Sequence, residues 1–386
     1  MIQPANRLQF VKEYYFSKKL REVAQLKAEG QPIINMGIGS PDLPPDPTVI
    51  EALSKTSHLA NSHGYQSYQG SPALRQAIAD FYNKYYQVSL NPANEILPMM
   101  GSKEAIMHIS MAYLNPGDRV LIPNPGYPTY SSVTELVCAK AEYYDLKQES
   151  QWLPDFDQLE SYAQTPIKLM WVNYPHMPTG ANADENALQK LVDFARKHGI
   201  LLVNDNPYSF ILTKEKRSIL SLEGADEIAL ELNSLSKTYN MPGWRVGMLC
   251  GNATYLKEVL KVKSNMDSGM FLGIQEGAIA ALNLPGTWFE EMDKVYQHRR
   301  ELVWKIADQL GAVYDKNSSG MFVWARLPDQ TDPLALVDKL LYENAIFITP
   351  GDIFGSNGKG YIRFSLCLAE DQIEEALQRV KATWTR

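Results

Sequence analysis

The sequence predicts an α/β fold with a large domain, built on a mainly parallel sheet flanked by helices, and a smaller α+β domain. Up to about residue 285, short apolar runs alternate with helical patterns, which is typical of a parallel sheet covered on both faces. Beyond that point the expected strands are half-exposed. The chain has 386 residues, enough for more than one core. We predict a large domain of residues 46–285 and a small domain formed by residues 1–45 and 286–386.

Helices of the large domain are expected where apolar residues recur at helical spacing. A first helix at 8–29, ending at Gly30, belongs to the N-terminal part of the small domain. The helix at 71–86 has Ser71 in the N-cap position and Pro72 at its first residue, both typical of a helix start. The other helices of the large domain are expected at 102–114, 128–139 and 185–198.

Strands of the large domain are expected where short apolar runs end at turn residues. They are predicted at 95–100, 119–125, 167–173, 200–204, 228–233 and 245–251. Most are apolar throughout, so the sheet should be buried on both faces.

The last part of the chain has a different texture. A long polar helix at 287–310 opens it. Strands are then expected at 320–328, 345–351 and 360–367, and helices at 333–343 and 369–384. This mixture predicts an α+β layer completed by the N-terminal helix.

Composition excludes several classes of function. The net charge is −7 at pH 7 and no basic block occurs, which disfavours nucleic-acid and anionic-membrane partners. No apolar run reaches 18 residues and the N-terminus has no signal-like apolar segment, so a cytoplasmic location is expected. The three cysteines lie far apart, and the six histidines show no paired ligand spacing. We expect a reducing compartment and no metal site.

A first chemical signal is the segment Gly-Ser-Lys-Glu-Ala at 101–105, where a strand gives way to a helix. Backbone N–H groups at a helix N-terminus, with the hydroxyl of Ser102, favour a phosphate. An ordinary N-cap is the more frequent use of such a segment. The glycine patterns of dinucleotide-binding and P-loop proteins are absent from the sequence.

Three further motifs follow expected strand ends. They are Asn-Pro-Gly-Tyr-Pro at 124–128, Asn-Tyr-Pro-His-Met-Pro-Thr-Gly at 173–180 and Val-Asn-Asp-Asn-Pro-Tyr at 203–208. Tyr127 could stack on a heteroaromatic ring, and Asp205 and Tyr208 stand at the carboxyl edge of the sheet, where open α/β sheets bind ligands. Each motif alone is more often a turn than a site.

The most informative stretch is Ser-Leu-Ser-Lys-Thr-Tyr-Asn-Met-Pro-Gly-Trp-Arg-Val-Gly at 234–247. Ser234, Ser236 and Arg245 supply hydroxyls and a planar cation suited to a phosphate. Lys237 lies among them, and a lysine near other cations and away from water is readily deprotonated to a nucleophilic amine. A single lysine is usually a solvated surface residue. Lys237, in contrast, occurs together with several other motifs that follow strand ends.

With these motifs in their order, the chain resembles the class I/II aminotransferases, which depend on pyridoxal 5′-phosphate (PLP) and have fold type I. The resemblance runs nearly end to end. It rests on the stretch at 234–247, which is similar to the PLP-lysine signature of the family, and on the segments at 37–42, 65–78 and 350–366.

The resemblance implies a role for each matching residue. Lys237 would form the aldimine with PLP and act with Asp205 and Tyr208 in catalysis, Asp205 on the pyridine nitrogen and Tyr208 on the ring 3-oxygen. Tyr127 would stack on the ring. The expected phosphate ligands are Ser102, Lys103, Ser234, Ser236 and Arg245.

Three more residues carry roles in substrate binding and assembly by the same resemblance. Arg363 would grip the substrate α-carboxylate, which the backbone at Gly39 approaches. Tyr65 would reach the phosphate of a neighbouring subunit, which implies a homodimer with shared sites.

One position departs from the family pattern. Met177 stands where the family usually has an asparagine that bonds the 3-oxygen, and a thioether is a poor replacement for an amide donor. Either Tyr208 serves the oxygen alone, or His176 or Asn173 compensates, and Asn173 is included among the expected cofactor contacts. We hypothesise altered cofactor electronics, with a raised aldimine pKa.

The implied reaction moves an amino group from an L-amino acid to a 2-oxo acid with ping-pong kinetics. Residues 264–273 lack the arginine that aspartate-type members use, and they resemble the branch of LL-diaminopimelate and broad amino-acid aminotransferases. The first helix contains three aromatic residues that could cover a pocket, namely Tyr14, Tyr15 and Phe16. Such residues more often pack in the core. We expect a donor with a neutral or aromatic side chain. The alternatives are a PLP-dependent C–S or other β-lyase, or an LL-diaminopimelate-type aminotransferase.

Overall fold

The large sheet of the structure, a computed structural model that describes residues 2–9, 11, 13 and 15–384, has seven strands. Their spatial order is β2 (Ile96–Met99), β8 (Gly247–Gly251), β7 (Ala229–Ser234), β6 (Leu201–Asp205), β5 (Leu169–Val172), β3 (Arg119–Asn124) and β4 (Lys140–Asp145). Neighbouring strands pair in parallel except where β8 pairs with β2 and β7. The prediction of a mainly parallel sheet is confirmed.

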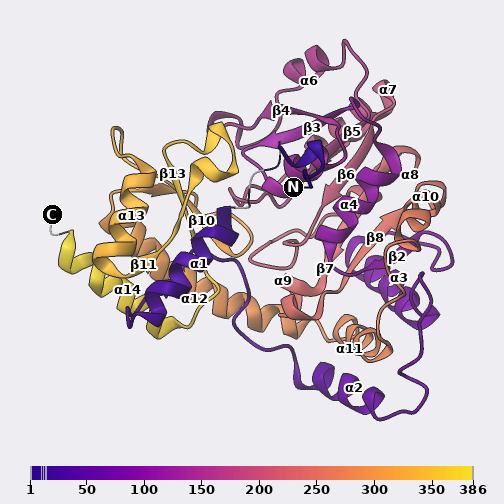
Figure 1. Ribbon diagram of the computed structural model, residues 1–386, viewed down its shortest axis with the longest axis horizontal. Coiled ribbons are helices and arrows are strands. Elements are labelled where there is room, and N and C mark those ends of the chain that lie inside the picture. Colours follow the sequence, from indigo (N-terminus) through magenta and orange to yellow (C-terminus); the bar gives the residue numbers. More distant parts are fainter. Residues whose placement is uncertain (1, 10, 12, 14, 385–386) are drawn as a thin grey trace.

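Both faces of this sheet are buried under helices, as the apolar strand sequences predict. On β3, Leu121 joins one apolar cluster while Val120 and Ile122 join another on the opposite face. The covering helices include α3 (Pro72–Tyr86), α4 (Ser102–Tyr113), α5 (Pro128–Leu136), α6 (Phe156–Tyr162), α7 (Glu185–His198), α8 (Ala225–Ile228), α10 (Ala253–Lys263) and α11 (Leu272–Leu282). α2 (Pro47–Ser57) packs on α11 at the lower edge of Figure 1.

Local signals account for the helix ends. Ser71 accepts a hydrogen bond from the backbone N–H of Leu74 at 3.1 Å, so it caps α3 as its sequence position predicts. Asp184 caps α7 through the N–H of Ala187, and Gly199 ends that helix in the left-handed conformation that glycine adopts without strain.

The C-terminal part forms a second, smaller layer. Its antiparallel sheet has the order β12 (Thr349–Pro350), β13 (Tyr361–Ser365), β10 (Phe322–Arg326) and β9 (Val313–Tyr314). The helices are α12 (Thr287–Gln309), α13 (Pro333–Asn344) and α14 (Glu370–Thr383).

The N-terminal segment is built into this smaller layer. β1 (Ile34–Asn35) pairs in parallel with β11 (Ile346–Phe347), and Phe16 and Met36 lie in the same apolar cluster as Phe364. Figure 1 shows the indigo helix α1 (Tyr15–Ala28) beside the orange and yellow C-terminal elements. The predicted domain boundaries at 45/46 and 285/286 stay a prediction that agrees with this arrangement.

Several expected elements differ in extent. The helix expected at 8–29 is instead a 3₁₀ turn at Asn6–Gln9 and a separate helix from Tyr15, with residues 10, 12 and 14 outside the described part. The strand expected at 245–251 begins only at Gly247, because Arg245 takes a left-handed conformation after a 3₁₀ turn. β4 was missed because its sequence, Lys-Ala-Glu-Tyr-Tyr-Asp, is half-exposed at the sheet edge and lacks an apolar run.

No helix in the described part of the chain combines the length and the apolar character that crossing a membrane requires.

Candidate functional site

A cavity of about 370 Å³ opens at the carboxyl edge of the large sheet, beside the smaller layer. The predicted site residues that line it are Gly39, Ser102, Lys103, Tyr127, Asn173, Asp205, Tyr208, Ser234, Ser236, Lys237, Arg245 and Arg363. They come from loops that are far apart in sequence, and parallel strands bring such loops to one edge. The fold therefore gathers these twelve residues, while Tyr65 lies elsewhere.

One end of the cavity is suited to an anion. α4 begins there with Ser102, after Gly101 in a left-handed conformation (φ 89°). A side chain at Gly101 would overlap the guanidinium of Arg245, so glycine lets the arginine approach the helix start. Ser234 and Ser236 line the same cavity, and their loop is held by a hydrogen bond from the Ser236 N–H to the Ser234 hydroxyl (3.2 Å). Helix N–H groups, hydroxyls and a guanidinium together bind phosphate well.

Lys237 lies in the short helix α9 (Leu235–Thr238), directly after β7. Its ammonium donates a hydrogen bond to the carbonyl of Gly39. Burial lowers the pKa of Lys237, and the neighbouring charges of Arg363 and Arg245 lower it further against an opposing effect of Cys367. A lowered pKa makes the neutral amine, the form that acts as nucleophile or base, easier to reach than for an exposed lysine.

Asp205 is the last residue of β6 and is 4% exposed. One carboxylate oxygen, Oδ2, accepts a hydrogen bond from the Tyr130 hydroxyl at 2.9 Å, whereas the other, Oδ1, is buried without a partner among the described residues. Burial raises the pKa of Asp205 to about 6, and the Tyr130 hydrogen bond opposes that rise. A buried acceptor in a cavity wall is suited to a donor from a bound molecule or an ordered water.

Tyr130 was not predicted as a site residue. It is fully buried, stacked on Trp171 with ring centroids 5.0 Å apart, and its hydroxyl fixes the orientation of Asp205. A signal was present in the sequence, because Tyr130 lies about one helical turn after Tyr127, at the start of α5. The two rings meet edge to face at 5.5 Å, and Tyr127 also lines the cavity.

Asn173 and Met177 lie in the loop after β5. The Asn173 side chain donates to the carbonyl of Asp205 and accepts the N–H of Met177, so it holds two backbone segments in place. Met177 is buried in the cavity wall with its sulfur 3.4 Å from a guanidinium nitrogen of Arg363. His176 is not among the lining residues, and its Nδ1 lies 2.8 Å from the Thr179 hydroxyl.

Arg363, on β13, forms the other end of the cavity. Its Nη2 donates to the carbonyl of Gly37 at 2.8 Å. Its guanidinium carbon lies 4.0 Å from the ring centroid of Phe322 and 4.7 Å from that of Phe354, close enough for cation–π attraction. Tyr208, 8% exposed, meets the Phe322 ring edge to face, and burial raises the pKa of its phenol.

The aromatic cover expected from the first helix is present in part. Phe16 and Leu20 line the cavity, whereas Tyr15 packs against core clusters and Tyr14 lies outside the described residues. Tyr65 is 93% exposed and does not line the cavity of its own chain.

We predict that the ligand-free chain loses stability as pH rises from 4 to 7 because of Asp205. Its folded pKa of about 6 lies above the ordinary value of 3.8, so the folded state binds the extra proton between these values. The free energy of unfolding of Asp205→Asn is compared with that of wild type at each pH. This difference should change in favour of the variant by on the order of 3 kcal/mol between pH 4 and pH 7. Urea unfolding across this range measures it, with the exposed residue change Asp80→Asn as control. Parallel curves for wild type and Asp205→Asn would contradict the prediction.

Comparisons with known proteins agree on one family. The model of the family "Aminotransferase class I and II" matches residues 31–380. The LL-diaminopimelate aminotransferase of Moorella thermoacetica is 37% identical over 382 residues, 98% of each chain, and that of Aquifex aeolicus is 36% identical over 383 residues, 99% of each.

Solved structures give the same picture. A substrate-bound BacF structure from Bacillus subtilis superposes with a TM-score of 0.95 at 34% identity, covering 99% of this chain and 98% of that one. A Thermus thermophilus aspartate aminotransferase mutant superposes with a TM-score of 0.90 at 26% identity, covering 98% and 99%. The large mixed sheet and the smaller antiparallel layer are thus those of fold-type I enzymes. The chain belongs to the class I and II aminotransferases and is a PLP-dependent aminotransferase.

Proposed function

We propose that this enzyme takes the amino group from an L-amino acid with a neutral or aromatic side chain and passes it to a 2-oxo acid by a ping-pong mechanism. One observation carries the proposal: Lys237 and Arg363 face one cavity whose remaining wall near Arg363 is aromatic and aliphatic. The lysine suits the amino group, the arginine suits the α-carboxylate, and the apolar wall suits an uncharged side chain.

The cavity fits PLP in its donor set. The anion end, with the α4 N-terminus and Arg245, suits the phosphate. The unpartnered Oδ1 of Asp205 suits a protonated ring nitrogen, and Tyr127 offers a ring face. Ser102, Lys103, Ser234 and Ser236 would complete the phosphate contacts, while Tyr208 and Asn173 would lie near the ring. When bound, PLP supplies an electron sink that stabilises negative charge on the substrate α-carbon.

Lys237 would hold the cofactor covalently and, once displaced by substrate, move the α-proton on its Nζ. Its lowered pKa supports this role, because a base must be neutral to accept a proton at neutral pH. Arg363 would orient the substrate through its α-carboxylate. The carbonyls of Gly37 and Gly39 lie beside these two cations, and a side chain at Gly39 would overlap the Phe322 ring.

The donor class follows from the cavity wall. Phe16, Leu20, Ile38, Phe322 and Phe354 line it, and of the described lining residues only Asp205 is acidic. Because Asp205 is buried at the sheet end, a distal ammonium on the substrate would find no other carboxylate among the described residues that line the cavity. The second candidate, an LL-diaminopimelate aminotransferase, is favoured by the names of relatives that are 36–38% identical.

A homodimer is part of the proposal. Tyr65 is 93% exposed, and exposed apolar side chains also occur at Leu59, six positions earlier, and at Met266. The loops around Tyr65 and Met266 touch, since Gly269 packs on the backbone of residues 66 and 67. A partner covering this surface would bury apolar area and bring Tyr65 to the neighbouring site.

The cytoplasmic location likewise stays a prediction.

The donor class is tested by adding single amino acids to the PLP-loaded enzyme without an oxo acid. We expect the visible band to convert to the pyridoxamine form with L-phenylalanine and other neutral amino acids, and at least about tenfold more slowly with LL-diaminopimelate or L-aspartate, whose distal charges would be desolvated unpaired. Faster conversion by LL-diaminopimelate would establish the second candidate. A persistent band with accumulating pyruvate and ammonia would indicate a lyase.

Replacing Lys237 tests the covalent anchor. We expect Lys237→Ala to lose the absorption of the lysine-bound cofactor and at least about 10³-fold in turnover, because both the anchor and the base are gone. The control is Lys257→Ala, on α10 away from the cavity. Full activity in Lys237→Ala would refute the site assignment.

Met177→Asn tests the departure from the family pattern. An amide at this position can donate to the ring 3-oxygen, so we expect the pH titration of the visible band to shift to a lower pKa. Met177→Leu keeps the volume without a donor and should titrate as wild type does. If Met177→Asn and wild type give the same titration, the thioether has no influence on the cofactor.

A further inference from the structure

The loop at 37–44 contacts both reactive cations of the cavity. It follows β1 and leads to α2. The carbonyl of Gly37 accepts hydrogen bonds from Arg363 Nη2 (2.8 Å) and from the Thr349 hydroxyl (2.9 Å). The carbonyl of Gly39 accepts the ammonium of Lys237. The loop therefore supplies one carbonyl acceptor to Arg363 and one to Lys237.

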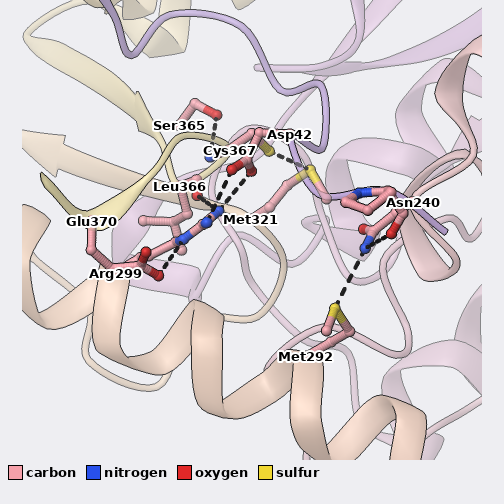
Figure 2. A network of polar contacts seen from close by, with 10 residues as sticks. Asp42, Asn240, Met292, Arg299, Met321, Ser365, Leu366, Cys367 and Glu370 are labelled. Carbon is pink, nitrogen blue, oxygen red and sulfur yellow. Dashed lines mark hydrogen bonds and ion pairs between the residues drawn. The ribbon is translucent and has the colours of Figure 1, made fainter. Parts of the chain in front are cut away.

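A buried arginine on α12 holds the far end of the same loop. Arg299 is 1% exposed, and its two terminal nitrogens donate to the two carboxylate oxygens of Asp42 at 2.6 and 3.0 Å. Its Nε donates to Glu370 at 2.9 Å, and Nη1 also donates to the carbonyl of Leu366 at 3.2 Å. Figure 2 shows Arg299 reaching from the helix toward Asp42 on one side and Glu370 on the other.

The helix α12 also contacts residues 237–240, which we call the lysine segment. Trp288 donates through its indole N–H to the carbonyl of Thr238 at 3.0 Å, next to Lys237. Asn240, 4% exposed, donates to the carbonyl of Pro44 at 3.3 Å and contacts the Met292 sulfur at 3.4 Å (Figure 2). Residues 288, 292 and 299 are four and seven positions apart, so they share one face of α12. This face of α12 therefore contacts both the lysine segment and the 37–44 loop.

Stability alone is a poor reason for this arrangement. Burying a guanidinium carries a large desolvation cost before its partners offset it, and an apolar residue of similar size is often at least as stabilising. A two-pronged arginine–carboxylate pair does fix geometry, because both bonds constrain the relative orientation of the groups. Asp42 is three residues from Gly39 and five from Gly37, so its placement is transmitted along a short stretch of backbone.

We propose that Arg299 and Asp42 are positioning residues for the substrate carboxylate subsite: they hold the 37–44 loop so that the carbonyl of Gly37 orients Arg363. The proposal rests on the proposed function for the identity of the subsite. The pair touches neither substrate nor cofactor, and it acts through the loop.

The chain offers a matched comparison, because Arg299 has two carboxylate partners and only one is on the loop. Asp42→Asn removes the loop pair. Glu370→Gln removes the pair to α14 and leaves the loop attached. Both carboxylates are partly exposed, at 27% and 39%, so each variant should fold. Arg299→Lys keeps the charge and loses the two-pronged geometry.

Four readouts on the PLP-loaded enzyme separate positioning from general loosening. They are the KM and kcat for L-phenylalanine, the dissociation constant of 3-phenylpropanoate by calorimetry, the dissociation constant of PLP and the thermal midpoint. For Asp42→Asn and Arg299→Lys we expect KM and the 3-phenylpropanoate constant to rise roughly tenfold, with PLP binding within about twofold of wild type. Glu370→Gln should lower the thermal midpoint comparably and leave both constants within about twofold of wild type.

Two results would overturn the positioning role. One is an equal rise of KM in Asp42→Asn and Glu370→Gln, and the other is a tenfold loss of PLP affinity that parallels the loss of carboxylate affinity. Failure of the proposed function is distinct, since wild type would then give no half-reaction with neutral amino acids. Binding of 3-phenylpropanoate would still test the loop.

Discussion

The crowding of positive charge at one edge of the sheet is the constraint on which the rest of the site depends. Lys103, Lys237, Arg245 and Arg363 line one cavity, and Asp205 is the single acidic side chain among the described lining residues. Burial lowers the pKa of Lys103 and Lys237, and the charge of Arg245 lowers both further. An anionic cofactor and an anionic substrate group offset this positive charge, so the site is complementary to what an aminotransferase binds.

Different contacts hold Arg363, Arg245 and Lys237 in place. Arg363 lies among aromatic rings and donates to a carbonyl, which replaces part of its hydration. Arg245 packs over Gly101, where the missing side chain leaves room, and donates to the carbonyl of Pro242. Lys237 is tied to the loop of Gly39. Asp205, the one anion, is oriented by Tyr130, whose ring is itself fixed on Trp171. All of these supports come from the protein's own residues, as preorganisation of a site requires.

The smaller layer contributes more than a cover. It supplies Arg363 and Phe322 from adjacent antiparallel strands, and it anchors the N-terminal segment by the pairing of β1 with β11. α12 then links this layer to the lysine segment through Trp288 and to the N-terminal loop through Arg299. The relative position of Lys237 and Arg363 therefore depends on both layers.

The sequence by itself determined the alternation of strands and helices, the mainly parallel sheet and the motifs at the strand ends, because apolar periodicity and helix caps are local properties. The family resemblance of its motifs also implied that Lys237, Asp205 and Arg245 share one site. It did not show the hydrogen bond from Tyr130 to Asp205 or the aromatic rings that pack around Arg363. Nor did it show the ion pair between Arg299 and Asp42. The Arg299–Asp42 contact joins residues 257 positions apart, and each of these contacts exists only once its own layer has packed. Pairing across such distances is decided by three-dimensional packing, which no local pattern encodes.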